Sequence, residues 1–267
     1  MKPRQRASPV SAADQVDKQQ TAARLVDLGK SDYAAAYRLQ QALVEKRRQA
    51  TAAGDIFIVT EHPATFTLGR RGGLQNLMVS EQFLQDKNIP LVPIERGGDI
   101  TYHGPGQLVI YPIIHLRQAG LTVAAYVHQL EQLMINLAAE CGVAAERDLR
   151  NHGVWAGGRK LGSVGIAIRH GVAFHGLALN VDVCLEPFSW VNPCGLTGVR
   201  MTTLSRECGR AVALDEVKGA LFDQLRAVFN RNLIPLDKDH PDVTMSERKK
   251  DGQTEMAQAQ PADRAGI

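Results

Sequence analysis

Two neighbouring strand-like runs constrain the fold of this chain more than any other feature of its sequence. They cover residues 161–168 and 172–181, and only Arg169, His170 and Gly171 separate them. A connection this short that contains a glycine is typical of a hairpin turn. The sequence therefore predicts a pair of adjacent antiparallel strands, preceded by a third strand at residues 153–156.

Helical patterns occur on both sides of this hairpin. Apolar residues recur at helical spacing from Asp32 to about residue 53, from Thr122 to Cys141, and after Asp215. Asp32 and Thr122 are suitable helix caps, and a glycine follows each of the first two helices. Further strands are expected at residues 56–59, 91–94 and 108–116. Because helices and antiparallel strands mix without a regular βαβ rhythm, we predict an α+β (mixed α/β) fold rather than a doubly wound one.

The domain organisation follows from composition. The chain has 267 residues, of which 44% are hydrophobic, enough for one large core. Residues 1–24 are polar, and the tail from residue 237 onward is charged and lacks aromatic residues. Neither end offers enough apolar surface to offset the entropy cost of ordering. We therefore predict a mobile extension at residues 1–24, one folded domain at 25–236 and a mobile tail at 237–267.

Charge and cysteine content exclude several classes of protein. The chain carries 31 Lys and Arg against 28 Asp and Glu, and no stretch combines basic and aromatic residues as nucleic-acid binders do. No window resembles a secretion signal or the roughly 20 apolar residues that span a bilayer. The four cysteines form no Cys-x-x-Cys pair, which argues against a zinc site or a disulfide framework. We expect a cytoplasmic protein that binds neither nucleic acid nor membrane; a mitochondrial presequence is disfavoured by Asp14 and Asp17.

A glycine-rich segment at residues 96–107, between two strands, is the most unusual part of the sequence. Glycines allow a backbone to approach a ligand closely, but the same composition is also typical of two tight turns. His103 within it has three interpretations: a proton carrier, a donor to an acyl carbonyl, or a hydrogen-bonded structural residue. The other histidines show no ligand spacing, so we predict no metal site.

Two further stretches place small residues on neighbouring strands. Residues 157–167 contain Lys160 at a strand entrance, which is either a group beside a binding site or an ordinary surface lysine. Residues 175–180 are small enough to form the floor of a pocket, or merely to permit close packing.

Cys194 has the best context for reactivity among the cysteines. It lies in a turn-rich loop, whereas Cys141 falls on the apolar stripe of a helix, and Cys184 is also a candidate for burial. A reactive thiol needs a nearby cation or N–H dipoles to lower its pKa from about 8.5. Lys160 would supply that cation if the fold brings the two residues together.

At this point the motifs resemble a known family, the lipoyl (octanoyl) transferases. The resemblance rests on blocks in the expected order that extend across most of the core: Glu61-His62-Pro63 with Thr67 to Arg70, Arg96 to Gln107, Gly158 to Gly165, His175 to Val181, and Pro193-Cys194-Gly195-Leu196. The resemblance implies a mixed sheet flanked by helices, like the catalytic domain of biotin and lipoate protein ligases.

The resemblance also implies an activity and its residues. Cys194 would carry an octanoyl (or lipoyl) group as a thioester, with Lys160 as its activator and no cofactor. The donor would be octanoyl-acyl carrier protein. The acceptor would be a lysine of lipoyl domains, in the E2 subunits of 2-oxoacid dehydrogenases and in the glycine cleavage H protein, as the first step of lipoylation from endogenous octanoate. Substrate-binding positions would be Arg96, Gly97, Gly98, Asp99, Ile100, Thr101, Tyr102, His103, Ser163, Val164, Gly165, Gly176, Leu177 and Ala178.

Two alternatives stay open. An ATP-dependent lipoate or biotin ligase would share the fold but would need no nucleophilic cysteine. A non-catalytic acyl-binding module would use the same pocket without turnover, and the presence of both Lys160 and Cys194 argues against it.

Overall fold

The computed structural model describes residues 21–49, 54–192, 198–240 and 243. Within these residues the larger sheet holds eight strands in the order β11-β1-β2-β6-β10-β9-β8-β7. β1 pairs with its two neighbours in parallel, and the other pairs are antiparallel. The strands are β1 (Thr21–Lys30), β2 (Asp55–Glu61), β6 (Gln107–His115), β7 (Glu146–Arg147), β8 (Gly153–Ala156), β9 (Arg159–Arg169), β10 (Val172–Asn180) and β11 (Arg231–Leu236).

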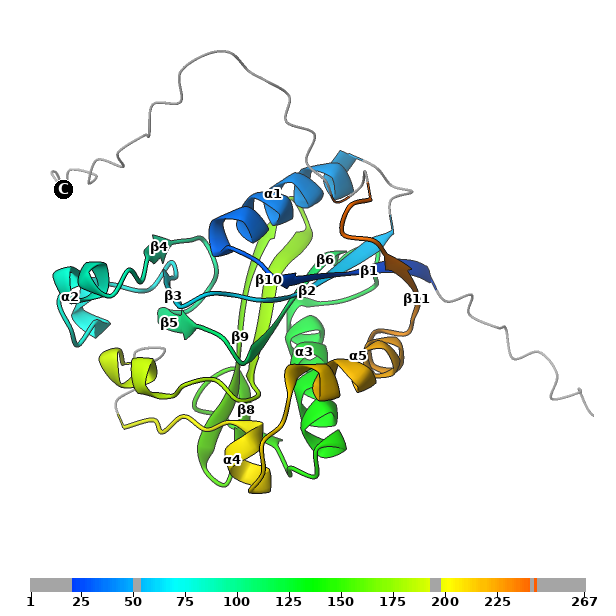
Figure 1. Ribbon diagram of the computed structural model, residues 1–267. Helices are drawn as coiled ribbons and strands as arrows, with labels where there is room; N and C mark the ends of the chain where they lie inside the picture. The colour runs from blue at the N-terminus through cyan, green and yellow to red at the C-terminus, as the bar shows by residue number, and fades with distance from the viewer. Residues whose placement is uncertain (1–20, 50–53, 193–197, 241–242, 244–267) are drawn as a thin grey trace, which may run out of the picture.

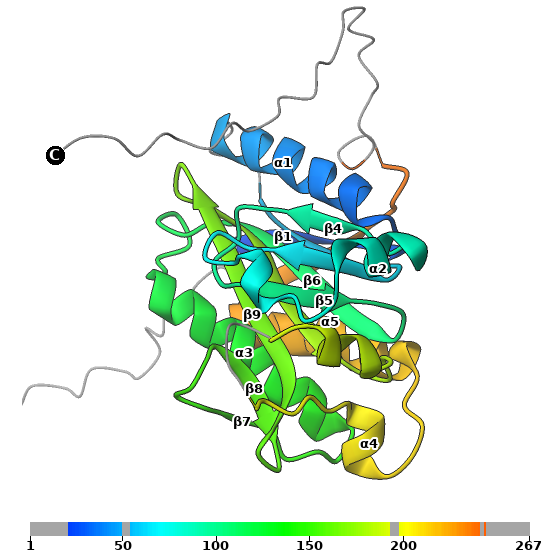
Figure 2. The same ribbon diagram turned by 90° about the vertical axis from the view of Figure 1, so that its left-hand side faces the viewer.

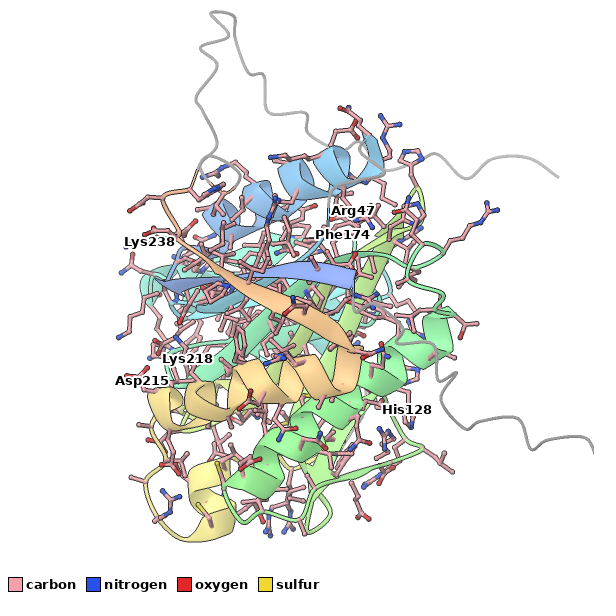
Figure 3. All side chains as sticks on the ribbon, turned by 90° about the vertical axis from the view of Figure 1, so that its right-hand side faces the viewer. Arg47, His128, Phe174, Asp215, Lys218 and Lys238 are labelled. Atoms are coloured by element: carbon pink, nitrogen blue, oxygen red, sulfur yellow. The ribbon has the colours of Figure 1, made fainter. Side chains whose placement is uncertain are left out.

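Helices cover both faces of this sheet. Helix α1 (Tyr33–Gln49) lies against β6 and β10 on one face, while α3 (Val123–Glu140) and α5 (Leu214–Phe229) lie side by side on the other (Figures 1 and 3). A hydrophobic core fills each interface, with Phe174 in the core beneath α1 and Leu177 in the core beneath α3 and α5. The short helix α4 (Leu204–Cys208) precedes α5.

A smaller sheet lies beside the larger one (Figure 2). Its strands in the described residues run in the order β4 (Leu91–Pro93), β3 (Thr65–Leu68) and β5 (Ile100–His103). Helix α2 (Glu81–Asp86) and the 3-10 helices η1 (Leu74–Asn76) and η2 (Glu186–Trp190) complete this part, which has a third apolar core.

The structure confirms the predicted hairpin and helix caps. β9 and β10 are antiparallel, with Arg169 opposite Val172, so that His170 and Gly171 form the turn. Both have positive φ, +49° and +81°, which is the conformation that a two-residue hairpin turn favours. At the start of α3 the side chain of Thr122 accepts a hydrogen bond from the backbone N–H of Ala125. These features were predictable because they depend on residues only a few positions apart.

The sheet is mixed and has helices on both faces, which confirms the predicted fold class. Strands β1 and β11, on one side of the larger sheet, were not predicted. Residues 21–24, assigned above to an N-terminal extension, form the start of β1, and β11 pairs with it in parallel. Within the described part of the chain, no helix is both long enough and apolar enough to cross a membrane.

Candidate active site

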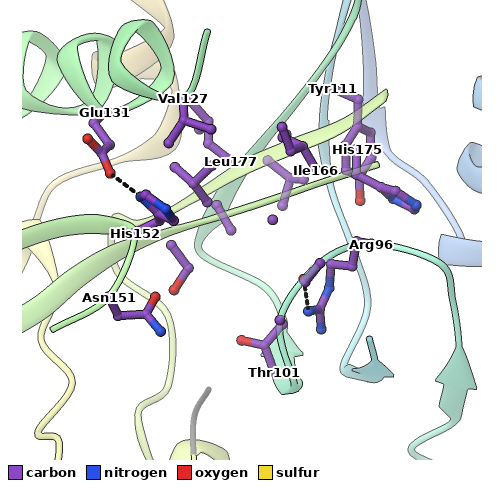
Figure 4. A pocket seen from close by; sticks show the side chains of 18 of the residues that line it. Arg96, Thr101, Tyr111, Val127, Glu131, Asn151, His152, Ile166, His175 and Leu177 are labelled. Atoms are coloured by element: carbon purple, nitrogen blue, oxygen red, sulfur yellow. Dashed lines mark hydrogen bonds and ion pairs between the residues drawn. The ribbon is translucent and has the colours of Figure 1, made fainter. Parts of the chain in front are cut away.

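A cavity of about 560 Å³ lies where the glycine-rich segments meet. In Figure 4, Asn151 and His152 lie at one end of the view and Tyr111 and His175 at the other. The lining comes from both sheets, α1, α3 and the loop before β8. It comprises Tyr33, Arg71, Arg96–Gly98, Thr101, His103, Val109, Tyr111, Val127, Glu131, residues 147–152, Ser163–Ile166 and His175–Ala178.

The first glycine-rich segment adopts its shape because Arg96 turns back on the chain. Its guanidinium donates to the carbonyl and hydroxyl oxygens of Thr67, both at 2.8 Å, and to the carbonyl of Gly97 at 3.1 Å. The N–H of Gly97 donates to the carbonyl of Ile166 on β9 at 2.8 Å. Gly98 has a φ of +89°, a conformation that glycine adopts without strain. The segment is therefore both a tight turn and part of the cavity wall.

In the rest of this segment, alternate residues of β5 face the cavity and the core of the smaller sheet. Successive side chains of β5 point to opposite faces, as the pleat requires. Thr101 and His103 face the cavity, whereas Ile100 and Tyr102 are buried in the core of the smaller sheet. Asp99 does not line the cavity either, because its carboxylate accepts hydrogen bonds from the Ile100 N–H and from Asn76. The other expected binding positions, from Arg96 to Gly98 and on β9 and β10, all line it.

Small residues on β9 and β10 keep the cavity open between the strands. Gly165 and Gly176 are directly opposite each other in the ladder. A Cβ on Gly176 would lie 2.2 Å from the carbonyl oxygen of Ile110, and a Cβ on Gly165 would lie 2.9 Å from Cδ of Arg96. Neither position has room for a larger residue, so both glycines are required by packing as well as by the cavity.

Two buried histidines form a hydrogen-bonded group behind the cavity. Nδ1 of His103 lies 2.8 Å from Oε1 of Gln107, and Nε2 of His62 lies 2.8 Å from the Tyr111 hydroxyl. The ring of Tyr33 stacks on that of His103 at 5.6 Å. Burial lowers the pKa of both histidines, that of His103 to about 3, so both rings are neutral at physiological pH. His103 thus satisfies the structural interpretation and also borders the cavity.

Lys160 is buried near the other end of the cavity. Its side chain is on β9 and the residue is only 1% exposed, so the interpretation as a surface lysine is wrong. Nζ donates to Oδ1 of Asn151, a cavity residue, at 3.0 Å and lies 5.7 Å from the centre of the Trp155 ring. A buried amine next to a ligand-sized cavity is a group that can act on a bound molecule.

Comparison with known proteins identifies the family. Residues 32–226 match the lipoyl protein ligase A/B catalytic domain. The octanoyltransferase of Desulfotalea psychrophila is 54% identical over 207 residues, which are 77% of this chain and 93% of that one. The chain belongs to the octanoyltransferase family. The octanoyltransferase of Syntrophobacter fumaroxidans is 46% identical over 208 residues, 78% of this chain and 91% of that one. The chain is accordingly an enzyme of the acyltransferase class.

Solved structures show that the octanoyltransferase fold is shared with ligases. A lipoate-protein ligase A bound with ATP superposes with a TM-score of 0.67 at 17% identity, over 83% of this chain and 91% of that one. A lipoate protein ligase from Thermoplasma acidophilum with bound lipoic acid gives a TM-score of 0.65, also at 17% identity, over 83% and 91%. At this identity the likeness establishes the fold, which agrees with the predicted one.

The proposed nucleophile of this octanoyltransferase family member, Cys194, lies outside the described residues, as do the other residues of its Pro-Cys-Gly-Leu block. Both flanks are described. Before the block, the N–H of Asn192 donates to the carbonyl of Asn76 at 2.8 Å. After it, the carbonyl of Arg200 accepts from the Lys160 N–H at 2.8 Å, and Thr202 N–H donates to the Lys160 carbonyl at 2.9 Å. The chain that follows the block is thus paired with Lys160.

The remaining cysteines have different surroundings. Cys141 is buried, as the helix pattern predicted, and burial raises the pKa of its thiol. Cys184 is exposed, which corrects the expectation that it is buried. It lies in the short loop between β10 and η2 rather than on a periodic apolar stripe, so composition gave no reliable indication of its position. Among the described residues, no group of three or more His, Cys, Asp or Glu side chains is placed to hold a metal ion.

Several cavity residues had no signal in the sequence. Tyr33 begins α1, Glu131 lies on the apolar stripe of α3, and Asn151 is in a short polar loop. Glu131 accepts hydrogen bonds from Arg147 Nε at 3.1 Å and from Gly153 N–H at 3.1 Å, which holds this loop against α3. These residues meet only through tertiary contacts, so no local spacing could have predicted them.

Proposed function

We propose that the chain transfers an octanoyl group from acyl carrier protein to a lysine of a lipoyl domain, through a thioester on Cys194. The observation that carries the proposal is the position of Lys160, a buried cation fixed by Asn151 beside a cavity floored with small residues. The octanoyltransferase relatives support the acyl group, and the name of the lipoyl protein ligase A/B domain supports a lipoyl-domain acceptor.

The first half-reaction loads the enzyme. The Cys194 thiolate attacks the thioester carbonyl of the donor, and a tetrahedral oxyanion forms. Collapse of this intermediate breaks the bond to the carrier's phosphopantetheine sulfur, which leaves as a thiolate and takes a proton from Lys160. A thioester is exchanged for a thioester, so the step requires no ATP. Backbone N–H groups of the glycine-rich segments would stabilise the oxyanion.

The second half-reaction forms an amide. The acceptor lysine has an unperturbed pKa of about 10.4 and must lose a proton before it attacks. Lys160, neutral after loading, accepts this proton. The free amine then attacks the acyl-enzyme, and the attacking nitrogen loses its second proton to solvent. The C–S bond breaks, and Cys194 leaves as a thiolate paired again with protonated Lys160. The cycle returns the enzyme to its starting state, and the amide product makes transfer favourable.

The acceptors we propose are the lipoyl domains of 2-oxoacid dehydrogenase E2 subunits and the glycine cleavage H protein. The substrate-binding positions are those named from Arg96 to His103, Ser163 to Gly165 and Gly176 to Ala178, of which Asp99, Ile100 and Tyr102 would act by shaping the wall rather than by touching the acyl chain. We place the reaction in the cytoplasm, where reducing conditions keep Cys194 as a thiol.

Intact mass spectrometry tests this proposal. The protein mixed with octanoyl-carrier protein in the absence of ATP should gain the mass of one octanoyl group, and a lipoyl domain added next should remove it. The Cys194→Ser variant should gain none, and Cys184→Ser, which changes an exposed cysteine, should be labelled like the parent. Labelling that appears only with ATP would favour the ligase alternative, and no labelling under either condition would favour a binding module.

A further inference from the structure

His175 is buried at the far end of the cavity with unsatisfied hydrogen-bonding capacity. It lines the cavity and is 1% exposed. Among the described residues neither ring nitrogen has a hydrogen-bond partner. The carboxylate oxygen Oε2 of Glu95 lies 3.8 Å from Nε2, which is longer than a hydrogen bond. Buried polar groups are almost always paired in folded proteins, so this ring calls for a partner that the described part of the chain does not supply.

The backbone conformation at His175 turns its ring toward helix α1. Its φ is +55°, in the left-handed region that non-glycine residues rarely adopt. Strand alternation would direct it, like Leu177, toward the core beneath α3 and α5. Instead its ring stacks on Tyr37 of α1 at 5.6 Å and on Phe174 at 4.8 Å, on the opposite face. Strained backbone that redirects a side chain into a cavity is typical of functional positions.

Neighbouring groups hold the ring in place. The N–H of His175 donates to Oε1 of Gln40 at 2.9 Å. Glu95 is fixed by the Tyr37 hydroxyl and by Arg169 at 2.7 Å. The adjacent His175 ring and then the Tyr37 hydroxyl hold the pKa of Glu95 at about 2, so this group is a carboxylate. Burial lowers the pKa of His175, which is therefore a neutral ring with one donor and one acceptor nitrogen.

The register of β9 and β10 sets the distance between His175 and Lys160. His175 pairs with Ile166 on β9, six residues beyond Lys160, so roughly 20 Å separate the two backbone positions at about 3.3 Å per residue. The part of β9 that lines the cavity, Ser163–Ile166, spans about 10 Å on the same measure. An extended eight-carbon chain spans about 8 Å at the roughly 1.2 Å per bond of an extended backbone. An acyl chain whose carbonyl carbon lies beside Ser163, at the end of this lining nearer Lys160, would thus finish close to Ile166 and its partner His175.

We propose that His175, supported by Glu95, is the end wall of the acyl cavity and a binding site for medium-chain acyl groups that carry a hydroxyl group at the carbon furthest from the thioester. The inference rests on the proposed function, because that function sets which end of the cavity holds the reacting carbon. A neutral hydroxyl fits a ring that can both donate and accept. A terminal carboxylate does not fit, because the Glu95 carboxylate lies behind the ring and repels a second anion.

Competition between two donors tests this inference. Octanoyl and 8-hydroxyoctanoyl groups on the same carrier protein are offered together, and the acylated lipoyl domain is resolved by mass spectrometry. The parent should transfer both within about tenfold of each other. His175→Phe should lower the hydroxyacyl-to-octanoyl product ratio by at least about tenfold, because the hydroxyl is then buried without a partner. Glu95→Gln should lower it in the same direction by a smaller factor.

The hydroxyacyl-to-octanoyl product ratio distinguishes a change in substrate specificity from a loss of folded protein. Both products come from one enzyme preparation, so a loss of folded protein lowers them equally and leaves the ratio unchanged. His128→Phe, which changes an exposed histidine of α3, should match the parent in rate and ratio. An unchanged ratio in both His175→Phe and Glu95→Gln, with octanoyl transfer intact, would overturn the inference. Absence of octanoyl transfer by the parent would overturn the proposed function instead.

Discussion

The far end of the cavity and the end near Lys160 are built from different kinds of structure. At the far end, His103 on β5 and His175 on β10 pack against tyrosines of α1 and are 6% and 1% exposed. Near Lys160 the wall is the loop of residues 148–152, where the Leu149 side chain is fully exposed. The contrast fits the proposed reaction, in which the rigid elements would bind the acyl chain and the open loop would leave access for the large protein partners.

The largest expected effect on activity is at the end of the cavity near Lys160. Lys160→Met should lower kcat/KM for octanoyl transfer by about 10²–10⁴-fold, because methionine fills the buried space but neither stabilises a thiolate nor carries a proton. Alkylation of Cys194 near pH 7 should also slow. Lys218→Met, which breaks an ion pair with Asp27 at a distant surface, is the matched control and should leave both rates unchanged. Equal alkylation rates in Lys160→Met and the parent would remove Lys160 from the activating role.

At the far end of the cavity, a substitution at the closely packed Gly176 should lower the stability of the fold. Gly176→Ala should lower the free energy of unfolding by about 1–3 kcal/mol, because its Cβ would meet the carbonyl oxygen of Ile110. Gly219→Ala, in α5, meets no atom within 4 Å and should raise stability by up to about 1 kcal/mol. Urea unfolding measures both. A Gly176→Ala protein as stable as the parent would show that the far end is less rigid than its contacts indicate.

The buried histidines should make stability depend on pH. The pKa of His103 is lowered to about 3 when folded, against about 6.5 when unfolded. Above pH 6.5 both states are neutral. As the pH falls below 6.5 the unfolded state gains a proton that the folded state does not, so stability should fall by up to about 1.4 kcal/mol per pH unit until about pH 3.

Thermal unfolding between pH 7 and pH 5 tests this slope. In His103→Gln the loss of unfolding free energy between pH 7 and pH 5 should be smaller than in the parent by about 2 kcal/mol. His62 and His175 have lowered pKa values for the same reason and should add to the slope in the parent. A stability curve that stays level down to pH 5 would contradict neutral burial of these rings.

The smallest effect is expected at the loop that holds Lys160. Asn151→Ala removes the acceptor for Nζ and should reduce kcat/KM by about three- to tenfold, the equivalent of one hydrogen bond to a charged group. Stability should change little, because the loop is largely exposed. Leu149→Ser, in the same loop, is the control for a loop substitution that leaves Lys160 untouched, and it should not alter unfolding. If Asn151→Ala matches the parent in rate, the side chain of Lys160 is positioned by other contacts.

Local chemistry explains what was predictable. The hairpin between β9 and β10, the Thr122 cap and the Asp32 cap, whose carboxylate accepts from Ala35 N–H at 3.0 Å, each depend on residues within a few positions. Strand β11, at the edge of the larger sheet, and β1 beside it were missed because they pair with each other across about 200 residues of sequence. A strand at a sheet edge has weak local preference, so its partner decides its structure.

The sequence by itself determined the family, the alternation of helices and strands in the core, and the glycines that both sheets require for close approach. Only the tertiary structure decided that Lys160 is buried beside Asn151, that Asp99, Ile100 and Tyr102 turn away from the cavity, and that His175 turns toward α1. The physical reason is that glycine patterns act through the local backbone, whereas burial and ring orientation depend on which distant side chains occupy the remaining space.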